Sequence, residues 1–376
     1  MIGGGRGAFI GAVHRIASAI DQQVELVCGA FSSSPEKSKA SGEDFYLPEN
    51  RCYGSYAEMM EKENALPEDQ RMDFVAIVTP NHVHFPAAKA ALEAGFNVLS
   101  DKPATLNIEE AQELARIVDA TGLVYGLTHN YTGYPMIKQA KHMVATGELG
   151  EIRKVVVEYP QGWLATKIED SNQKQAAWRT DPAKSGAAGC IGDIGTHAEN
   201  LAEYVSGLEI KELAADLTAF VEDRALDDDG NILLRFTNGA KGILHASQIS
   251  VGQENNISLR IWGATGGLEW KQSDANSLLV SKLEGPTQIY RSGGGDYLCE
   301  ASQEACRTPA GHPEGYLEAF ANIYKAYATH LQDRLIGNEK QSYDYPSIQD
   351  GIRGMAFINA TVASSSNNAA WTSIDC

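Results

Sequence analysis

Hydrophobic positions in the first 130 residues alternate between short apolar runs and longer stretches with helical spacing. The apolar runs have the length and composition of strands buried on both faces, and they cover residues 24–31, 73–80, 97–100 and 123–128. The stretches with helical spacing lie at residues 11–20, 55–63, 83–94 and 107–121. Alternating strands and helices are typical of a doubly wound parallel sheet, so the pattern predicts an α/β domain over residues 1–130.

The helix expected at 107–121 also carries a start signal. Asn107 is followed three residues later by Glu110, and apolar positions then recur at Ala111, Leu114 and Ala115. This order is typical of a helix N-terminus, where an Asn side chain accepts a hydrogen bond from the backbone of the first turn.

The pattern changes after residue 150. Long β-type runs follow, at residues 152–160, 210–221, 231–250 and 256–271. The stretch FTNGAKG at 236–242 is a hairpin signal, because Asn-Gly favours a tight turn. Two helices are expected at 314–335 and 347–364, and the Gly-, Ser- and Pro-rich segment 284–311 reads as a long loop. We therefore expect a second α/β domain over residues 131–376, built on a large, mostly antiparallel sheet.

Composition narrows the class of protein. The chain has 376 residues, 43% of them hydrophobic, and a formal net charge of −18, which argues against nucleic acid and anionic membranes as partners. No apolar run approaches the roughly 18–20 residues of a membrane span, and the first residues do not read as a secretory signal. The six cysteines are scattered without a CxxC pair, so neither a disulfide framework nor a zinc site is expected. We expect a cytoplasmic enzyme.

The stretch GGGRGAFIG at residues 3–11 resembles a dinucleotide-binding turn. It offers G-x-G-x-x-A across Gly3, Gly5 and Ala8, with a further glycine at Gly7. In a Rossmann turn the first glycine makes the bend, the second lets the backbone approach a pyrophosphate, and the third small residue lets helix and strand pack closely. Only two residues precede Gly3, so either the first strand is very short or residues upstream are missing from the sequence. Phe9 and Ile10, which directly precede the expected helix at 11–20, complete this set of candidate cofactor-binding residues.

The end of the second expected strand bears on the choice of cofactor. An acidic residue there would bind the adenosine ribose and select NAD. Ser32 and Ser33 stand there instead, followed by Lys37. Serine hydroxyls bind either a ribose hydroxyl or a 2′-phosphate, and a lysine favours the phosphate. NAD is the expected cofactor, and NADP stays open.

The stretch CIGDIGTHAENL at 190–201 places Asp193 and His197 four residues apart at the start of an expected helix. The two side chains would share one helix face. The pair could bind a metal, together with His82 and His84, or act in catalysis. Asp193 could also simply cap a helix that happens to carry a histidine.

Four separated motifs together resemble the Gfo/Idh/MocA family of nicotinamide-dependent sugar and cyclitol oxidoreductases. They are the glycine turn at 3–8, TPNHVH at 79–84, SDKP at 100–103 and GDIGTH at 192–197. The resemblance covers nearly the whole chain and implies a Rossmann domain followed by an open-faced α/β domain. The usual E-K-P of the family is D-K-P here, which leaves the lysine in place. NYTGYPM at 130–136, AWRTDP at 177–182 and GHPEGY at 311–316 resemble a subgroup acting on inositols or pyranose sugars.

The resemblance implies a catalytic triad of Lys102, Asp193 and His197. Oxidation of a secondary alcohol needs a base near the carbinol, and the ordinary pKa of histidine suits neutral pH. Asp193 would orient the substrate or the imidazole, and Lys102, after a buried strand, would bind the reacting oxygen. No metal is then required.

Further site residues are implied with less support. The family places the TPNHVH loop at the cofactor, which makes candidates of Thr79, Pro80, Asn81, His84 and the neighbouring Asp101. Other candidates for the cofactor are Asn130, Trp178 and Arg179, although Arg179 could equally pair with Asp181. Candidates for the substrate are Lys102, Tyr131, Tyr159, Trp163, Arg179, Asp193, His197 and His312. The acidic run 227–229 reads as a solvated turn.

The expected function is NAD(P)-dependent oxidation of a secondary hydroxyl of an inositol or pyranose sugar to the ketone or lactone. An NADPH-dependent keto-sugar reductase and a non-catalytic dinucleotide sensor are the alternatives, and a metal-dependent hydrolase is a third. An open-faced sheet needs a cover, so a homo-oligomer, dimer or tetramer, is expected.

Overall fold

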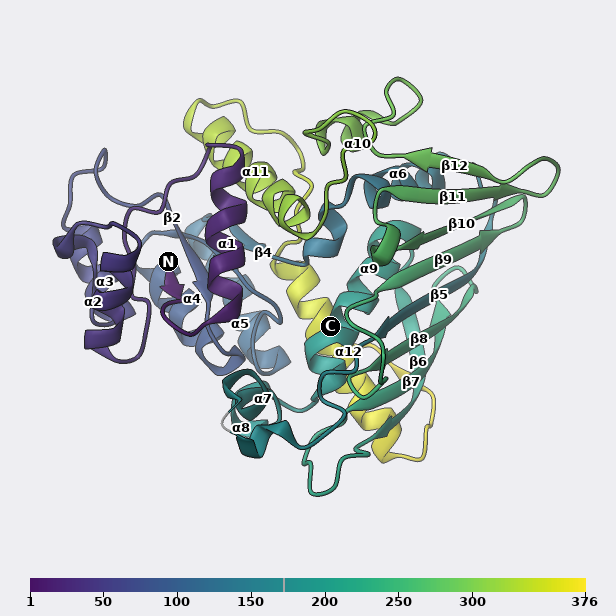
Figure 1. Ribbon diagram of the computed structural model, residues 1–376, viewed down its shortest axis with the longest axis horizontal. Coiled ribbons are helices and arrows are strands. Elements are labelled where there is room, and N and C mark those ends of the chain that lie inside the picture. Colours follow the sequence, from purple (N-terminus) through teal and green to yellow (C-terminus); the bar gives the residue numbers. More distant parts are fainter. Residues whose placement is uncertain (172) are drawn as a thin grey trace. The chain divides into compact units, whose positions relative to one another are not determined.

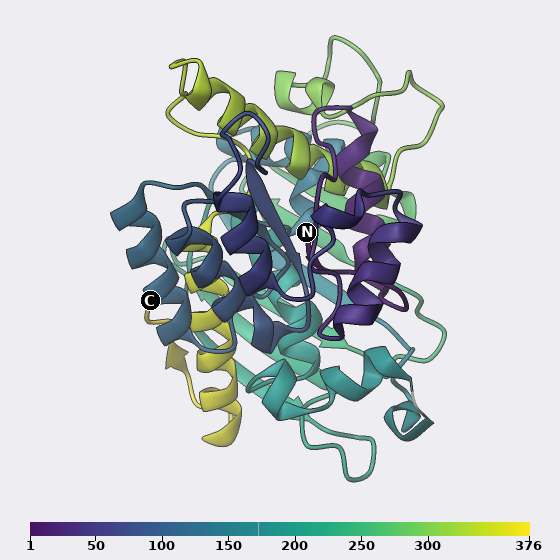
Figure 2. The ribbon, with the colours of Figure 1, turned by 90° about the vertical axis from the view of Figure 1, so that its left-hand side faces the viewer.

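The computed structural model describes residues 1–171 and 173–376 (Figures 1 and 2). The chain forms two compact units. The first comprises Met1–His129 with Phe320–Ile352, and the second comprises Asn130–Ala319 with Arg353–Cys376. No helix within the described residues is both long and apolar enough to cross a membrane.

The first unit is built on a four-stranded parallel sheet with the strand order β1-β2-β3-β4. Its strands are β1 (Ile2–Gly3), β2 (Phe74–Val78), β3 (Asn97–Ser100) and β4 (Tyr125–Leu127). The helices between them are α1 (Phe9–Ile20), α2 (Pro35–Asp44), α3 (Tyr56–Asn64), α4 (His84–Glu93) and α5 (Ile108–Thr121). Short 3-10 turns occur at Glu49–Arg51 and Asn81–Val83. The strands are almost fully buried, as their uninterrupted apolar sequences predict. The doubly wound parallel sheet is confirmed.

Helix α5 begins as its sequence predicts. Asn107 is the N-cap, and its Oδ1 accepts a hydrogen bond from the backbone N–H of Glu110 at 2.9 Å. The Glu110 carboxylate accepts a bond from the backbone N–H of Leu106 at 3.2 Å, so the two side chains satisfy donors on either side of the helix start. The helix ends at Gly122, whose φ of 65° is left-handed.

The strand expected at 24–31 does not form. The segment makes only isolated bridges, Ile2 with Ala30 and Gly29 with Cys52. Its backbone does run beside β1, since Gly3 N–H donates to Ala30 O at 2.9 Å and Ala30 N–H donates to Met1 O at 3.0 Å. A ladder is no longer than its shorter strand, and β1 has two residues, so a long apolar run gains little pairing there.

The chain returns to the first unit near its C-terminus. Leu127 N–H donates to Pro346 O at 2.8 Å, and Tyr327 Oη donates to Val124 O at 3.1 Å, so residues 320–352 cover the edge of β4. The sequence pattern places this segment in the second domain, whereas it packs with the first unit.

The second unit is built on a nine-stranded sheet with the order β12-β11-β10-β9-β5-β8-β7-β6-β13. The strands in chain order are β5 (Ile152–Pro160), β6 (Ile210–Thr218), β7 (Asp229–Phe236), β8 (Lys241–Ser247), β9 (Ser258–Gly263), β10 (Gly266–Lys271), β11 (Ser277–Lys282), β12 (Gln288–Arg291) and β13 (Thr372–Ser373). All pairs are antiparallel except β5 with β8 (Figure 1). The mostly antiparallel sheet is confirmed, and so is the hairpin at 236–242, where Gly239 has a φ of 92°.

Helices α6 (Pro135–Ala145) and α9 (Thr196–Ser206) pack on one face of this sheet. The remaining helices in chain order are α7 (Lys174–Arg179), α8 (Pro182–Ser185), α10 (Glu300–Glu304), α11 (Tyr316–Leu335) and α12 (Ile348–Ser366), with a π-helical turn at Ile191–Gly195 and 3-10 turns at Asn130–Gly133, Ile168–Ser171 and Gln272–Asp274. The opposite face of the sheet carries a row of paired positions, Ala214, Leu233, Ile243 and Val156. Leu233 and Ile243 are exposed by 53% and 37%.

The segment expected to be a loop, 284–311, contains the strand β12 and the helix α10. Strand β12 lies at the edge of the sheet, and its residues are exposed or half-buried. An edge strand without a covered face needs no alternation of apolar and polar residues, so its sequence gives no strand signal.

Candidate functional site

The glycine turn between β1 and α1 has the backbone that a bound pyrophosphate requires. Gly3, Gly4 and Gly7 have φ values of 81°, 74° and 78°. A Cβ on Gly5 would lie 2.5 Å from Ser41 Oγ, so only glycine fits there. The N-terminus of α1 has no side-chain cap and no acidic residue in its first turn, which leaves its N–H groups to a ligand. These features fit a dinucleotide phosphate.

Helix α1 makes a close backbone contact with the glycine turn at Gly11, three residues after Ala8. Ala8 is the N-cap residue of α1. A Cβ on Gly11 would lie 2.3 Å from Gly4 Cα and 2.4 Å from Gly4 O. The α-helix and the glycine turn therefore touch backbone to backbone at Gly11, a position that the sequence pattern did not single out.

The candidates for the adenosine end lie at the start of α2. Ser34 is the N-cap of this helix and accepts the Lys37 N–H at 3.3 Å, while Ser32 Oγ accepts the Ser34 N–H at 3.2 Å. The side chains of Ser33 and Lys37 are exposed. The start of α2 thus presents the hydroxyl groups of residues 32–34 and the ammonium group of Lys37, and residues 32–34 supply no carboxylate.

His84 holds two loops together. The ring is fully buried, with Nδ1 2.7 Å from Pro103 O and Nε2 2.9 Å from Thr79 O. Burial lowers the pKa of His84, and the two carbonyl hydrogen bonds only partly oppose this. The histidine that the family motif offers to the cofactor thus joins the loops after β2 and β3. Thr79, Pro80 and the buried Asn81 are the residues of this motif beside it.

Asp101 and Lys102 follow β3 directly, at the carboxyl edge of the sheet where such folds bind ligands. Asp101 Oδ1 accepts the Lys102 N–H at 2.9 Å and the Thr128 hydroxyl at 3.1 Å. Burial raises the pKa of Asp101, but the neighbouring imidazole of His14 and the charge of Lys102 outweigh this effect and hold that pKa well below its usual range. Burial, aided by the Lys102 charge, lowers the pKa of His129 to about 3.

Asp193 and His197 lie on one continuous helical segment of the second unit. Asp193 is inside the π-helical turn at Ile191–Gly195, and His197 is in the first turn of α9, buried at 8% exposure. Asp193 Oδ2 accepts Arg179 Nε and Gln248 Nε2, each at 2.9 Å. The N-cap positions of the two helical segments are Cys190 and Gly195, so Asp193 is not a helix cap.

Arg179 forms an ion pair with Asp193, with 2.9 Å between Arg179 Nε and Asp193 Oδ2. Asp181 caps α8 by accepting the Ala183 N–H at 3.0 Å, and it also accepts Lys184 Nζ at 2.6 Å. The Arg179 guanidinium lies 4.2 Å from the centre of the Trp178 ring. The same group lies 5.8 Å from the centre of the Trp163 ring, so this cation and two aromatic faces meet beside Asp193.

The acidic run 227–229, which reads as a solvated turn, is largely buried. Asp227 accepts the Gly189 N–H at 2.7 Å and the Ile191 N–H at 2.8 Å, which fixes the start of the segment bearing Asp193. Burial raises the pKa of Asp227, against the effect of these two hydrogen bonds. Asp228 is 1% exposed and binds Arg224 at 3.0 Å. The prediction of a solvated turn is wrong, because these carboxylates have backbone and guanidinium partners.

Two tyrosines surround the His197 ring. The Tyr131 ring meets it edge-on, at 5.0 Å and 85° between planes, and the Tyr159 ring lies 6.2 Å away. The two hydroxyls bind each other, and Tyr159 also donates to Asn255 Oδ1 at 2.8 Å. Burial raises the pKa of Tyr131 to about 12, so its hydroxyl stays protonated at neutral pH.

A chain of amides connects the tyrosines to Asp193. Asn255 Oδ1 accepts from Gln161 Nε2, and Gln161 Oε1 accepts Trp163 Nε1 at 3.0 Å and Gln248 Nε2 at 3.5 Å. Gln248 in turn donates to Asp193. The sequence pattern missed Gln161, Gln248 and Asn255. Gln161 and Gln248 follow the paired strands β5 and β8, so the pairing of these strands would have revealed two of them.

The other predicted site residues are placed as follows. Asn130 is buried at 1% exposure, and its Nδ2 has no hydrogen-bond partner among the described residues. His312 is exposed, and its Nδ1 lies 3.3 Å from Pro309 O. His82 is exposed as well. Within residues 1–171 and 173–376, no three or more His, Cys, Asp or Glu side chains gather in a metal-binding group.

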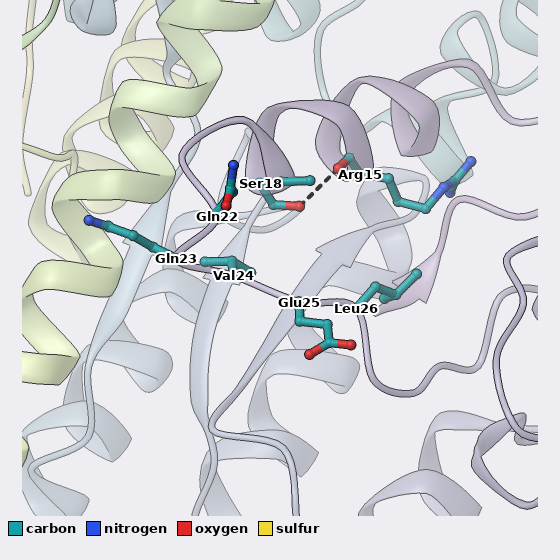
Figure 3. Close-up of a pocket in the computed structure, with 8 residues that line it drawn as sticks. Arg15, Ser18, Gln22, Gln23, Val24, Glu25 and Leu26 are labelled. Atoms are coloured by element: carbon teal, nitrogen blue, oxygen red, sulfur yellow. Dashed lines mark hydrogen bonds between the residues drawn. The ribbon is translucent and has the colours of Figure 1, made fainter. Parts of the chain in front are cut away.

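A surface hollow of about 510 Å³ lies at the other end of α1, lined by residues between Arg15 and Leu26. Figure 3 shows Arg15 and Ser18 on the last turns of the helix and Glu25 on the segment that follows. The glycine turn is at the opposite end of the same helix, so this hollow is separate from the cofactor edge of the sheet.

Comparison with known proteins agrees with this geometry. Residues 1–129 match the family described as an oxidoreductase family with an NAD-binding Rossmann fold, and residues 137–269 match the GFO/IDH/MocA C-terminal domain. An uncharacterized oxidoreductase, YfiI, from Bacillus subtilis is 33% identical over 99% of this chain and 95% of its own length. An oxidoreductase from Sinorhizobium meliloti has a TM-score of 0.89 and 45% identity, covering 99% of this chain and 98% of its own.

A third relative was solved with ligands. It is the inositol dehydrogenase homolog from Azotobacter vinelandii in complex with NADH and myo-inositol, with a TM-score of 0.92 and 34% identity over 99% of this chain and 96% of its own. These matches define an oxidoreductase with an NAD-binding Rossmann domain. The chain belongs to the Gfo/Idh/MocA family, which confirms the resemblance and the predicted cofactor class.

Proposed function

We propose that this protein is an NAD-dependent dehydrogenase that oxidises a secondary hydroxyl of an inositol or a related cyclic polyol. The observation that carries the proposal is the arrangement around Asp193, which Arg179 and Gln248 hold one helical turn before His197. The support from relatives is the homolog from Azotobacter vinelandii, which binds NADH and myo-inositol and aligns over 99% of this chain.

The chain's own residues divide the work of alcohol oxidation. His197 accepts the hydroxyl proton, and the two tyrosine rings around it limit the rotation of its imidazole. Asp193, which is fixed by two donors on one oxygen, orients a neighbouring substrate hydroxyl. Lys102 supplies a positive charge that stabilises the developing alkoxide, a role that the family motif assigns to it. The glycine turn would hold NAD, which would supply the acceptor for the hydride.

The proposal also concerns the cofactor's 2′ group, the polyol that is bound and the direction of the reaction. The serines and the exposed Lys37 at the start of α2 are groups that bind a 2′-phosphate, which is compatible with NADP. An NADPH-linked keto-sugar reductase is therefore the second candidate. We further propose a cytoplasmic homo-oligomer. The exposed Leu233 and Ile243 in the middle of the sheet are the apolar surface that a second copy would cover.

The deciding experiment follows absorbance at 340 nm with NAD or NADP and a panel of inositols and pyranoses. Lys102→Ala is compared with Lys89→Ala, which removes a lysine that pairs with Glu93 and Glu113 on helices α4 and α5. We expect one class of polyol to reduce one cofactor, and Lys102→Ala to lower kcat by at least about 100-fold while Lys89→Ala leaves it unchanged. Cofactor binding without turnover by the wild type would instead identify a dinucleotide sensor.

A further inference from the structure

We propose that His14 is a positioning residue for Lys102, acting through the carboxylate of Asp101. The inference deepens the proposed function, because it concerns the same lysine. His14 lies on the buried face of α1, one turn after Gly11, and its side chain has no solvent exposure. Neither the family motifs nor the candidate site residues include it.

The contacts of His14 point in two directions. Its Nδ1 lies 2.8 Å from the hydroxyl of Tyr324 on α11. Its Nε2 faces Asp101 Oδ2 at 3.9 Å and has no hydrogen-bond partner within the described part of the chain. The Phe320 ring packs against the imidazole at 5.1 Å, so the ring cannot swing to another partner without displacing an aromatic side chain. Asp101 is thus the charged group that faces Nε2, and Tyr324 is the titratable group that faces Nδ1.

These contacts define the tautomer of His14. A carboxylate only accepts hydrogen bonds, so Nε2 carries the proton that faces Asp101. Nδ1 is then an acceptor, and Tyr324 donates its hydroxyl hydrogen to it. Tyr324 therefore donates a hydrogen bond to His14, and His14 directs its own N–H toward Asp101. The 3.9 Å gap is longer than a hydrogen bond, so the attraction across it is electrostatic in this structure.

Asp101 connects His14 to Lys102 through the Lys102 backbone. Its Oδ1 accepts the backbone N–H of Lys102 and the hydroxyl of Thr128, while Oδ2 is the oxygen that faces His14. The carboxylate is therefore held from both sides, and the backbone from which the Lys102 side chain leaves is fixed. Because His14 also belongs to the helix that begins at the glycine turn, the same helix would both hold the cofactor phosphates at its N-terminus and position Lys102.

The test compares two substitutions of His14. Glutamine can place an N–H near the position of Nε2, whereas leucine fills the space without any donor. We expect His14→Leu to lower kcat about tenfold or more, with KM for the polyol and the Kd of NADH changed by less than about twofold, and His14→Gln to recover most of kcat. A role in packing alone predicts the reverse order, with leucine at least as active as glutamine among the aromatic neighbours. Equal kcat for wild type and His14→Leu would also overturn the proposal.

A second readout does not depend on turnover. Lysines of the intact protein are ¹³C-methylated, and the Lys102 resonance is assigned with Lys102→Arg. We expect this resonance to move in His14→Leu and to stay near its wild-type position in His14→Gln, and an identical spectrum for all three proteins would refute the inference. If the wild type proves inactive, the proposed function fails and this spectrum still decides the role of His14. Should His14→Leu not fold, Tyr324→Phe replaces it, with the same shift of the Lys102 resonance expected.

Discussion

The buried carboxylate of Asp228 offers a direct test of how the second unit is held together. Asp228→Ala removes the acceptor of three hydrogen bonds, from Phe220 N at 2.9 Å, Val221 N at 3.0 Å and Arg224 Nη1 at 3.0 Å. The side chains of Arg224 and Asp228 are each 1% exposed, so water cannot replace the lost partner without opening the loop.

The expected cost follows from these contacts. Removing one partner of a buried ion pair destabilises a protein by about 3–5 kcal/mol, because the other charge stays buried. Arg224 keeps its bonds to Glu169 at 3.0 Å and to Leu164 O at 2.9 Å, which limits the loss. Two backbone donors without acceptors add about 1–3 kcal/mol each if no water reaches them. With the low end of each range, about 3 kcal/mol for the ion pair and about 1 kcal/mol for each backbone donor, we expect Asp228→Ala to lower the free energy of unfolding by about 5 kcal/mol.

The measurement is urea unfolding followed by tryptophan fluorescence. The five tryptophans at 163, 178, 262, 270 and 371 all belong to the second unit, so the signal reports on that unit. Asp170→Ala is the matched control. The Asp170 side chain is 71% exposed, and its ion pair with Lys167 is long, at 3.8 Å. The control should change stability by less than about 0.5 kcal/mol. Equal shifts of the midpoint in the two variants would refute the reasoning.

Two further predictions concern the first unit's glycine turn and the sheet of the second unit. Gly11→Ala would place a Cβ 2.3 Å from Gly4 Cα, so we expect the turn to shift and NADH affinity to fall at least about tenfold in a fluorescence titration, and unchanged affinity would contradict the packing argument. His245 and Asp229 form an ion pair across β8 and β7, with 3.6 Å between Nε2 and Oδ1; the Asp229 carboxylate raises the pKa of His245, and the His245 imidazole lowers that of Asp229. The histidine contributes stability below its unfolded pKa of about 6.5 and loses it as pH rises through its raised folded pKa, while the aspartate contributes above its unfolded pKa of about 3.8 and loses it on acidification. His245→Gln should therefore lower the urea midpoint most near pH 5 and least above pH 8, and a constant difference across this range would count against the pair.

Local patterns were enough to predict much of the first unit. Strands β2, β3 and β4 are short and apolar throughout because both faces are covered, and Asn107 with Glu110 starts α5 through bonds within four residues. The family motifs were found because each is a short string of residues. The fold and the family of the chain were confirmed by its matches to known proteins, whereas the catalytic roles of the motif residues remain predictions.

The errors have a common cause, which is that distant parts of the chain decided the outcome. The apolar run 24–31 has the composition of a strand, but a two-residue neighbour limits its pairing. The run 227–229 reads as solvated because its partners are far away, the backbone of Gly189 and Ile191 among them. Only the spacing of Arg224 and Asp228, four residues apart, carried a local hint of a buried pair.

The central strand β5 has a consequence for how the second unit folds. Strands β6 to β8 form one meander and strands β9 to β12 another, each through neighbours close in sequence. Strand β5 precedes both and joins them, pairing parallel with β8 and antiparallel with β9. Contacts between residues close in sequence form faster than distant ones, so we expect the two meanders to form first and the join through β5 to limit the folding rate. A chain that has not yet placed β5 would expose two unpaired strand edges, which makes this intermediate the one most prone to aggregation.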